Sequence, residues 1–276
     1  MRVAVVGHVE WIEFARVPRV PEPGAIVHAS ETWEEPGGGG AVAAVQLAKL
    51  AGGATFFTAL GNDALGHRAF AELTALGLRV EAAWRDEPQR RGFVHVDARG
   101  ERTITVIGDR LGPGGSDDLP WADLEGVDAV YYTAGDSAAL AHARSARTLV
   151  ATARHLEPIA EGGVQVDVLV ASANDAGERY ERDQVHPEPL AVVRTAGDQG
   201  GAWEDSAGPS GRWSATPLPG PVSDAYGCGD SFAGGLTYGL GADLALPEAL
   251  ALGARCGAAN FTGRGPYAGQ LTAAAL

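Results

Sequence analysis

Lysine is almost absent from this chain of 276 residues: Lys49 is the only one, so arginine carries nearly all of the positive charge. A Walker phosphate-binding loop needs a lysine directly after its last glycine, and no GxxxxGK sequence followed by Ser or Thr occurs. Any phosphate chemistry must therefore use backbone N–H groups, a helix N-terminus, arginine or a metal ion.

Cysteine is also scarce. The two cysteines, Cys228 and Cys256, do not form a CxxC pair, and two thiols in so long a chain suggest no disulfide framework. We expect both to be reduced and buried. The histidines show no HExxH or similar spacing, so no zinc site is predicted.

Long apolar runs are missing as well. The chain begins with a short apolar stretch before His8 and Glu10, which is too brief for a signal peptide or a membrane span. The net charge of −14 argues against a nucleic-acid partner, because phosphate backbones select basic surfaces. We therefore expect a cytoplasmic protein that acts on small molecules, with no membrane and no nucleic acid as partner.

The chain is instead rich in apolar residues, which make up 45% of it, enough to bury a large core. Short apolar runs alternate with Ala- and Leu-rich helical stretches, as in a parallel sheet covered by helices. The pattern predicts strands at 2–6, 54–60, 128–133, 148–152, 167–171 and 190–195, and helices at 41–50, 66–76, 138–144, 228–238 and 247–262.

Two further stretches differ from this alternation. Residues 9–35 are broken by prolines, and residues 92–108 form two alternating runs about a turn at 98–100. Such sequences are typical of edge strands and hairpins, so we expect a small sheet outside the main core. Residues 205–220 are rich in Gly, Pro and Ser and are expected to be irregular or a hairpin.

The sharpest motif is a glycine-rich turn that runs directly into a helical segment. Gly227 and Gly229 let backbone N–H groups turn to one side, and the helix that begins there adds its positive end, which favours an anion. Asp230 lies in the first turn, where a carboxylate can accept a proton from a hydroxyl that attacks phosphorus. The alternative is that Asp230 only complements the helix dipole and that the glycines merely form a turn.

The surrounding residues favour the first interpretation, because Asp224 to Gly235 resembles the C-terminal motif DTxGAGDxFxxG of the ribokinase-like (PfkB-type) carbohydrate kinases. Ala225 and Cys228 are minor departures. The resemblance implies that Asp230 is the catalytic base. It also implies that the backbone forms the anion hole for the transferred phosphate at Gly227, Cys228 and Gly229.

Other landmarks of the family occur in the expected order. Pro36 to Ala41, followed by Leu47 to Leu50, resembles the GGxxAN…LAxLG motif, and Leu60 to Gly66 is similar to the GxDxxG turn. Gly100 to Thr103 resembles the return strand of the substrate lid, and Thr195 to Gly200 resembles the TxGxxG turn at the nucleotide.

The resemblance implies an α/β fold, a ribokinase-like three-layer α/β/α architecture with a central mostly parallel sheet and a small β lid. We predict one kinase domain over residues 1–276, with the lid formed from about 9–35 and 90–110. The family also implies ATP and Mg²⁺, with a monovalent cation as a further candidate cofactor. A homodimer through the β lid is a candidate assembly.

The substrate contacts of the family are only partly present. Gly38 and Gly39 would let a polyol approach backbone groups at a helix N-terminus, although Gly37 to Gly40 also fits a simple flexible turn. Ile12 stands where relatives often have Asp, and Val42 where they have Asn. The substrate is then less hydroxylated than ribose or fructose, or it is held from elsewhere, by Glu10, Glu13 or Arg102.

The motif NxxE, which organises water around magnesium in relatives, is also altered. Its positions are Ser172 and Asp175, and Asp175 would act on the ion through water or would only cap the next helix. Asn174 and Glu178 are an alternative pair. The resemblance places the nucleotide against Ser172, Thr195, Gly197, Gly200 and Asn260. Arg102 and Arg264 are candidates for phosphate or acid groups.

The leading hypothesis is an ATP-dependent kinase that transfers the γ-phosphate to a hydroxyl of a sugar or related small molecule, with Asp230 as general base. A nucleoside kinase is an alternative, since Ile12 and Val42 could suit a base. A non-catalytic metabolite sensor of the same fold is another. A nucleotide-binding oxidoreductase is disfavoured, because no GxGxxG follows the first strand.

Overall fold

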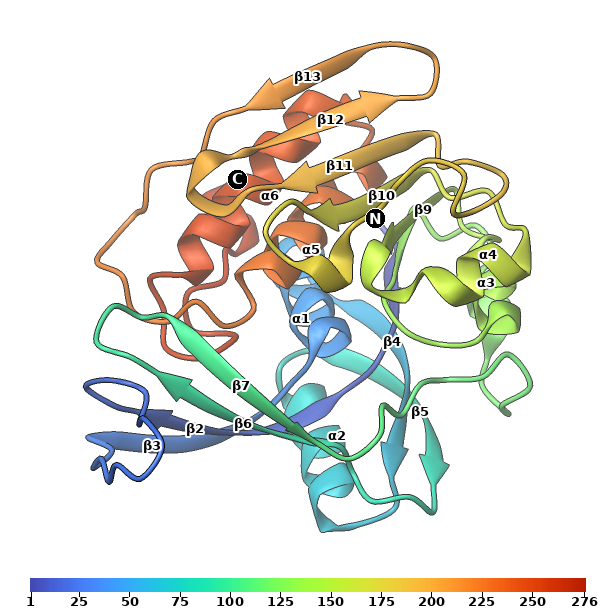
Figure 1. The fold of residues 1–276 in the computed structure, drawn as a ribbon. Coiled ribbons are helices and arrows are strands. Elements are labelled where there is room, and N and C mark those ends of the chain that lie inside the picture. Colours follow the sequence, from blue (N-terminus) through green and yellow to red (C-terminus); the bar gives the residue numbers. More distant parts are fainter.

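The computed structural model describes residues 1–276, and a large twisted sheet runs through it (Figure 1). The strand order is β13-β12-β11-β10-β9-β8-β1-β4-β5; the strands from β11 to β5 are parallel, and β12 and β13 add an antiparallel hairpin at one edge. The strands are β1 (Val3–Val6), β4 (Ala54–Gly61), β5 (Leu78–Arg85), β8 (Ala129–Tyr132), β9 (Thr148–Thr152), β10 (Val168–Ser172), β11 (Ala191–Thr195), β12 (Gly201–Asp205) and β13 (Ser210–Trp213).

Helices cover both faces of this sheet. Because side chains alternate along a strand, Val3 and Val5 of β1 enter one hydrophobic core, while Ala4 and Val6 enter the other. The first core is completed by α1 (Gly39–Ala51), α2 (Ala64–Ala75), α5 (Cys228–Gly241) and α6 (Leu246–Asn260), and the second by α3 (Ser137–Ala143) and α4 (Leu156–Gly162). Burial on both faces explains the uninterrupted apolar strands. The three-layer fold with a mostly parallel sheet is confirmed.

A second, four-stranded sheet has the order β3-β2-β6-β7 and lies below the large one in Figure 1. It comes from the two stretches predicted to lie outside the main core: β2 (Glu10–Arg16), β3 (Glu31–Gly37), β6 (Arg91–Val96) and β7 (Arg102–Ile107). On its inner face Phe14 stacks on Trp33 at 4.8 Å between ring centroids and meets Tyr226 edge-on at 5.1 Å. The small sheet therefore packs against the segment that leads into α5.

Three elements were not predicted from the sequence. Strand β5 has a single fully buried residue, Leu78, and carries charged residues between its apolar ones, so it shows no apolar run. Helix α4 has seven residues and contains Pro158, which is too short for a helical period. Strand β12 precedes the stretch in which we expected a hairpin, and β13 lies inside it.

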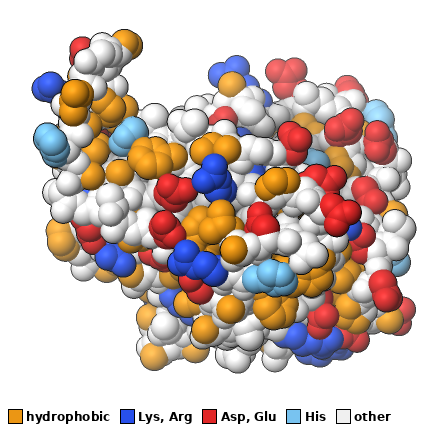
Figure 2. Space-filling model, turned by 90° about the horizontal axis from the view of Figure 1, so that it is seen from below, with side chains coloured by type: hydrophobic (Ala, Val, Ile, Leu, Met, Phe, Trp, Pro, Cys, Tyr) orange, Lys and Arg blue, Asp and Glu red, His pale blue; other side chains and the backbone are white.

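The outer surface of the small-sheet side is chemically mixed. Seen from below, hydrophobic side chains lie among acidic and basic ones (Figure 2). All six residues of β7, the free edge of the small sheet, are exposed, Ile104, Val106 and Ile107 among them. None of the helices combines the length and the apolar character that a membrane crossing needs.

Candidate active site

The N-terminus of α5 is open and polar. Gly227, its N-cap, has φ +77°, a left-handed conformation that glycine adopts without strain. The first helical hydrogen bond runs from Ser231 N to Gly227 O (2.8 Å), so the amides of Cys228, Gly229 and Asp230 have no acceptor inside the helix. A Cβ added at Gly229 would meet nothing within 4 Å. This end of α5 can therefore receive an anion.

Buried side chains fix the shape of this loop from below. The carboxylate of Asp224 accepts hydrogen bonds from Tyr226 N (2.9 Å) and Gly265 N (3.1 Å), and its burial raises its pKa. Asn260 is fully buried, and its Nδ2 donates to Tyr226 O (2.7 Å). The structure thus places Asn260 beneath the loop as a support.

The two glycine-rich motifs meet here. Gly38 N donates to the hydroxyl of Tyr226 at 2.9 Å, although the two residues are 188 positions apart in the chain. A Cβ added at Gly39 would lie 2.8 Å from Oδ1 of Asp230. The side chain of Val42 is fully buried beneath Gly227, where an added Cβ would approach it to 2.8 Å. Only glycine at position 39 leaves room for the carboxylate beside the start of α1.

The electrostatics of Asp230 suit a base. Burial, with a smaller contribution from the charge of Glu178, raises the pKa of Asp230 to about 6, against the opposing charges of Arg102 and Arg154. Such a carboxyl group is mostly ionised at neutral pH, yet it binds a proton far better than an exposed aspartate.

The neighbouring thiol is chemically quiet. Burial raises the pKa of Cys228 to about 11, so the thiol is neutral at physiological pH and residue 228 has only its backbone N–H to offer an anion. Both cysteines are free; Cys256 is buried, whereas Cys228 is partly exposed.

The candidate substrate residues on β2 point in two directions. Glu10 is buried, and its Oε1 lies 3.8 Å from His8 Nε2 and 3.0 Å from Arg90 Nε. Ile12 is on the same face but fully buried, wedged against Gly37 and Gly92. Glu13 is on the opposite face because side chains alternate along a strand, and it pairs with Arg91 at 3.4 Å. The structure therefore does not bring Glu13 to Glu10.

The two arginines singled out from the sequence are both tied to the protein. Arg102 on β7 donates to Ala225 O (2.9 Å), just before the glycine-rich loop. Arg264 pairs with Glu31 (2.7 Å) and lies 5.1 Å from the ring centroid of Trp33. Arg102 thus faces the loop, whereas Arg264 fastens the C-terminal segment to the small sheet.

The residues expected at the nucleotide lie at the carboxyl ends of β10 and β11, the edge where ligands bind in parallel α/β sheets. Ser172 and Thr195 are paired in register across these strands. Gly197 and Gly200, with φ +58° and +75°, flank a short turn; a Cβ at Gly200 would lie 2.1 Å from Trp213 O. Ser172, Thr195, Gly197 and Gly200 therefore lie together, whereas Asn260 binds the α5 loop, and its contact with the nucleotide stays a prediction.

Asp175 and Glu178 share one cation, Arg154, at 2.5 and 2.7 Å. Asp175 also accepts from Gly177 N (2.8 Å), and this bond together with Arg154 holds the pKa of Asp175 below its usual value. Asp175 thus caps the short helical turn Ala176–Glu178, and its role at magnesium stays a prediction. No group of three or more His, Cys, Asp or Glu side chains is arranged to hold a metal ion by itself.

One feature was missed by sequence reasoning: a cavity of about 460 Å³ that is rich in arginine. Its ionisable lining comes from four separate stretches of chain, and no motif marks any member of it. These residues are Arg85, Arg90, Arg110, Asp136 and His155.

Residues 1–273 match the sequence pattern of the pfkB family carbohydrate kinases. The chain belongs to the pfkB family. This confirms the predicted family and the predicted class of enzyme, a carbohydrate-kinase phosphotransferase. A ribokinase of Staphylococcus aureus (strain COL) is 27% identical over 110 residues, which is 39% of this chain and only 36% of that relative.

Solved structures of pfkB-like proteins resemble the whole chain. The adenosine kinase from Sinorhizobium meliloti has a TM-score of 0.80 at 20% identity, covering 99% of this chain and 98% of that one. The ribokinase from Cryptococcus neoformans var. grubii serotype A in complex with ADP has a TM-score of 0.75 at 20% identity, with the same coverage of 99% and 98%. At this level of identity the likeness shows the ribokinase fold.

Proposed function

We propose that this pfkB-family protein transfers the γ-phosphate of ATP to a hydroxyl group of a sugar or a related small molecule. The observation that carries the proposal is one juxtaposition: the carboxylate of Asp230, with its pKa raised to about 6, stands against Gly39 and beside the free amides that begin α5. A proton acceptor and an anion site at one place are what phosphoryl transfer requires.

In the proposed reaction the acceptor hydroxyl lies against Asp230. The carboxylate takes the hydroxyl proton as the oxygen bonds to the γ-phosphorus, and the bond from that phosphorus to the β–γ bridging oxygen breaks, releasing ADP. Negative charge on the transferred group faces the amides of Cys228 and Gly229, which are already oriented by the left-handed turn at Gly227.

We propose that residues 1–276 act as one kinase domain whose small sheet is a lid. Two hydrogen bonds fasten this sheet to the loop: Ala225 N donates to Gly100 O (2.9 Å), and Arg102 donates to Ala225 O (2.9 Å). Closure of such a lid excludes water and limits hydrolysis of ATP. The exposed edge strand β7 is the surface through which we propose a homodimer.

The nucleotide is proposed to lie against Ser172, Thr195, Gly197 and Gly200, and the ADP complex of the Cryptococcus ribokinase supports a nucleotide in this fold. Asp175 and Glu178 are the carboxylates that would hold Mg²⁺, through water, because their side chains are partly exposed and the ion takes few protein ligands. Bound there, the ion would neutralise phosphate charge. Arg154 holds the two carboxylates in place for it.

The direct test is phosphate transfer from ATP to a panel of sugars, sugar acids and nucleosides, measured as phosphorylated product. Asp230→Asn should lower kcat by about 10²- to 10⁴-fold, because the general base is lost, while ATP affinity measured by calorimetry is retained. Asp118→Asn, an exposed aspartate, is the matched control and should leave kcat unchanged. Intact ATP binding without transfer to any acceptor would count against catalysis and favour a metabolite sensor.

A nucleoside acceptor is the second candidate. Ile12 and Val42, which replace polar residues of the family motifs, are both fully buried apolar side chains, so the usual polar contacts to a sugar are missing. The adenosine kinase neighbour shows that the fold is compatible with such an enzyme. The same acceptor panel separates the two candidates.

A further inference from the structure

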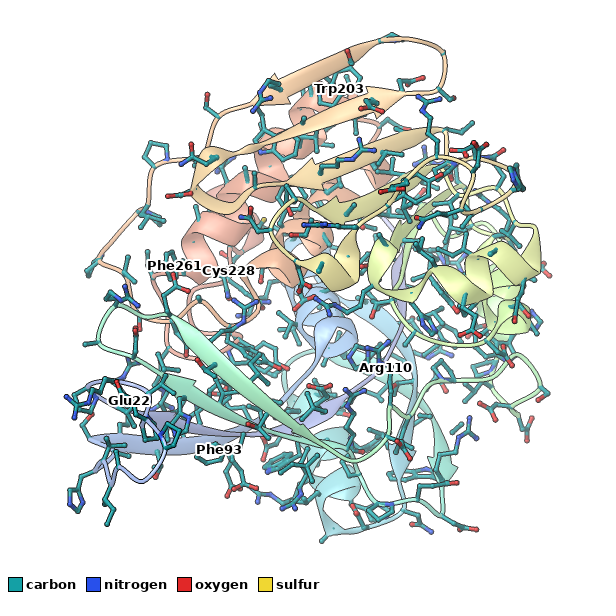
Figure 3. All side chains as sticks on the ribbon, viewed as in Figure 1. Glu22, Phe93, Arg110, Trp203, Cys228 and Phe261 are labelled. Atoms are coloured by element: carbon teal, nitrogen blue, oxygen red, sulfur yellow. The ribbon has the colours of Figure 1, made fainter.

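The arginine-rich cavity lies between the small sheet and the large one. Arg85 and Arg90 come from the end of β5 and the segment after it, Arg110 from the segment after β7, and Ala134 to Asp136 from the segment after β8. Figure 3 shows Arg110 where the chain passes from the small sheet back towards the large one. The cavity volume of about 460 Å³ is in the range of small-molecule sites.

Most of the charged groups in this cavity already have partners. Arg85 donates to both oxygens of Asp117, at 2.8 and 2.6 Å, and Arg90 Nε lies 3.0 Å from Glu10 Oε1. Asp136 accepts from Ala139 N (2.7 Å) and so caps α3. Arg85 and Asp136 are therefore satisfied within the protein, whereas Arg90 Nε makes no hydrogen bond with Glu10.

Arg110 is different. Its guanidinium makes no ion pair and no hydrogen bond, and its Nε is buried without a partner. Burial, followed by the nearby charge of Arg90, lowers its pKa, but an arginine stays protonated near neutral pH. A half-buried cation that has no protein partner and lines a cavity is available to bind an anion there.

The neighbouring residues do not supply it. Glu10 is the acidic group that acts on Arg110, but it is already engaged by Arg90, and its own burial raises its pKa. His8 is held neutral, because burial and then Arg110 lower its pKa well below the usual value. Arg154 adds a further positive charge to the surroundings of Arg110. The region around Arg110 therefore has an excess of positive charge.

A short chain of contacts connects this region to the candidate active site. Glu10 Oε1 lies 3.8 Å from His8 Nε2, and His8 Nδ1 lies 3.4 Å from Thr133 Oγ1. Thr133 Oγ1 is 3.6 Å from the position of a Cβ on Gly39, the same position that lies 2.8 Å from Asp230 Oδ1. Ala134, directly after Thr133, lines the cavity, so the cavity lies beside the candidate active site.

We propose that the phosphate acceptor is an anionic small molecule, a sugar acid or a sugar phosphate, whose carboxylate or phosphate binds Arg110 and Arg90 while its hydroxyl lies at Asp230. This inference rests on the proposed kinase function. Arginine suits the task because its planar guanidinium binds either group through two hydrogen bonds. Binding by charge would also replace the polar sugar contacts that are missing at Ile12 and Val42.

Matched acceptors test the proposal: gluconate against glucitol, and ribose 5-phosphate against ribose, each assayed for phosphorylated product. A charged acceptor should be preferred over its neutral partner in kcat/KM. Arg110→Gln should then lower kcat/KM for that charged acceptor by about 10- to 100-fold, mainly through KM, and leave KM for ATP unchanged. The kcat/KM of Arg110→Lys for that acceptor should lie between those of the wild type and Arg110→Gln, because the charge remains but the paired hydrogen bonds are lost.

Arg99→Gln is the matched control, since Arg99 is exposed on the turn of the small sheet and pairs only with Asp97. It should behave as the wild type. Equal use of charged and neutral partners by the wild type, or an equal loss for both in Arg110→Gln, would overturn the proposal.

A binding measurement separates this inference from the kinase function. Gluconate and inorganic phosphate should each raise the Tm of the Asp230→Asn protein, and the double variant with Arg110→Gln should lose that rise. Arg110-dependent anion binding without phosphate transfer to any acceptor would leave the anion site standing and defeat the kinase function. Absence of Arg110-dependent binding by either probe would defeat the anion site whatever transfer is seen.

Discussion

The glycine-rich loop before α5 and the arginine cavity beside it are built in opposite ways. In the loop, Asp224 and Asn260 bind backbone groups, and the groups offered to a ligand are amides at the helix start. In the cavity, the group without a protein partner is the side chain of Arg110. An anion can complete either one. The loop would hold the phosphate common to every turnover, whereas the cavity would hold the group that distinguishes one acceptor from another.

The contrast teaches where selectivity can change in this fold. Backbone amides offer the same donors whatever the side chains are, so the loop tolerates cysteine at position 228. A guanidinium is present or absent with a single substitution. The two regions should therefore respond to mutation differently, the loop in rate and the cavity in choice of acceptor.

Gly39→Ala should have the largest effect on rate among the backbone changes. The added Cβ would lie 2.8 Å from Asp230 Oδ1 and push the carboxylate away, although the backbone of Gly39 itself accepts alanine. A displacement of this kind should lower kcat by about 10- to 100-fold. Steady-state kinetics would show it. Gly162→Ala, whose Cβ would make ordinary contacts at 3.4 Å or more, is the control and should match the wild type.

The pH dependence of kcat/KM should reflect the titration of Asp230 at the α5 loop rather than of any group in the cavity. Because burial raises the pKa of Asp230 to about 6, activity should fall about tenfold for each pH unit below that value, as the base becomes protonated. Glu178→Gln should move this limb to lower pH, since the charge of Glu178 is the second cause of the raised pKa. A limb that stays in place would mean that another group is titrating.

Protein stability should distinguish Arg85 from Arg110, two of the three arginines that line the cavity. Arg85→Gln removes both hydrogen bonds to Asp117 and should lower the free energy of unfolding by about 1–3 kcal/mol. Arg110→Gln removes no hydrogen bond and relieves a half-buried charge, so its Tm should equal or exceed that of the wild type. Thermal unfolding near neutral pH measures both. An equal loss in the two variants would make Arg110 a structural residue.

The same contrast explains how much could be predicted from the sequence. Each parallel strand, and the α5 loop, is one unbroken stretch of sequence that can be recognised by itself. The strands are apolar runs buried on both faces, and the loop has glycines next to an aspartate at a helix start. Strand β5 gave no such signal, because as an edge strand it buries only Leu78 completely. The cavity gave none either. Arg90 and Arg110 become neighbours only when β6 and β7 pair, and single arginines carry no pattern.

The smallest effect we expect is that of the Asp230 charge on the free energy of unfolding of the protein. Its pKa in the folded protein, about 6, lies above the ordinary 3.8, so the folded state prefers the protonated form. That preference is fully present below about pH 4 and is lost as pH rises through 6, where the buried carboxylate becomes charged. Asp230→Asn should therefore gain about 1–2 kcal/mol over the wild type at pH 8, a few degrees in Tm, because the partly exposed site lessens the full effect.

The gain from Asp230→Asn should shrink as the pH is lowered and vanish near pH 4, because the wild-type carboxyl group is then neutral as well. Thermal unfolding at several pH values would follow it, with Asp118→Asn as the control that shows no such trend. A gain that does not depend on pH would locate the effect in packing instead of charge. In that case the carboxylate is not held in a state that folding disfavours, and the contrast with Arg110, the other half-buried charge without a partner, would not hold.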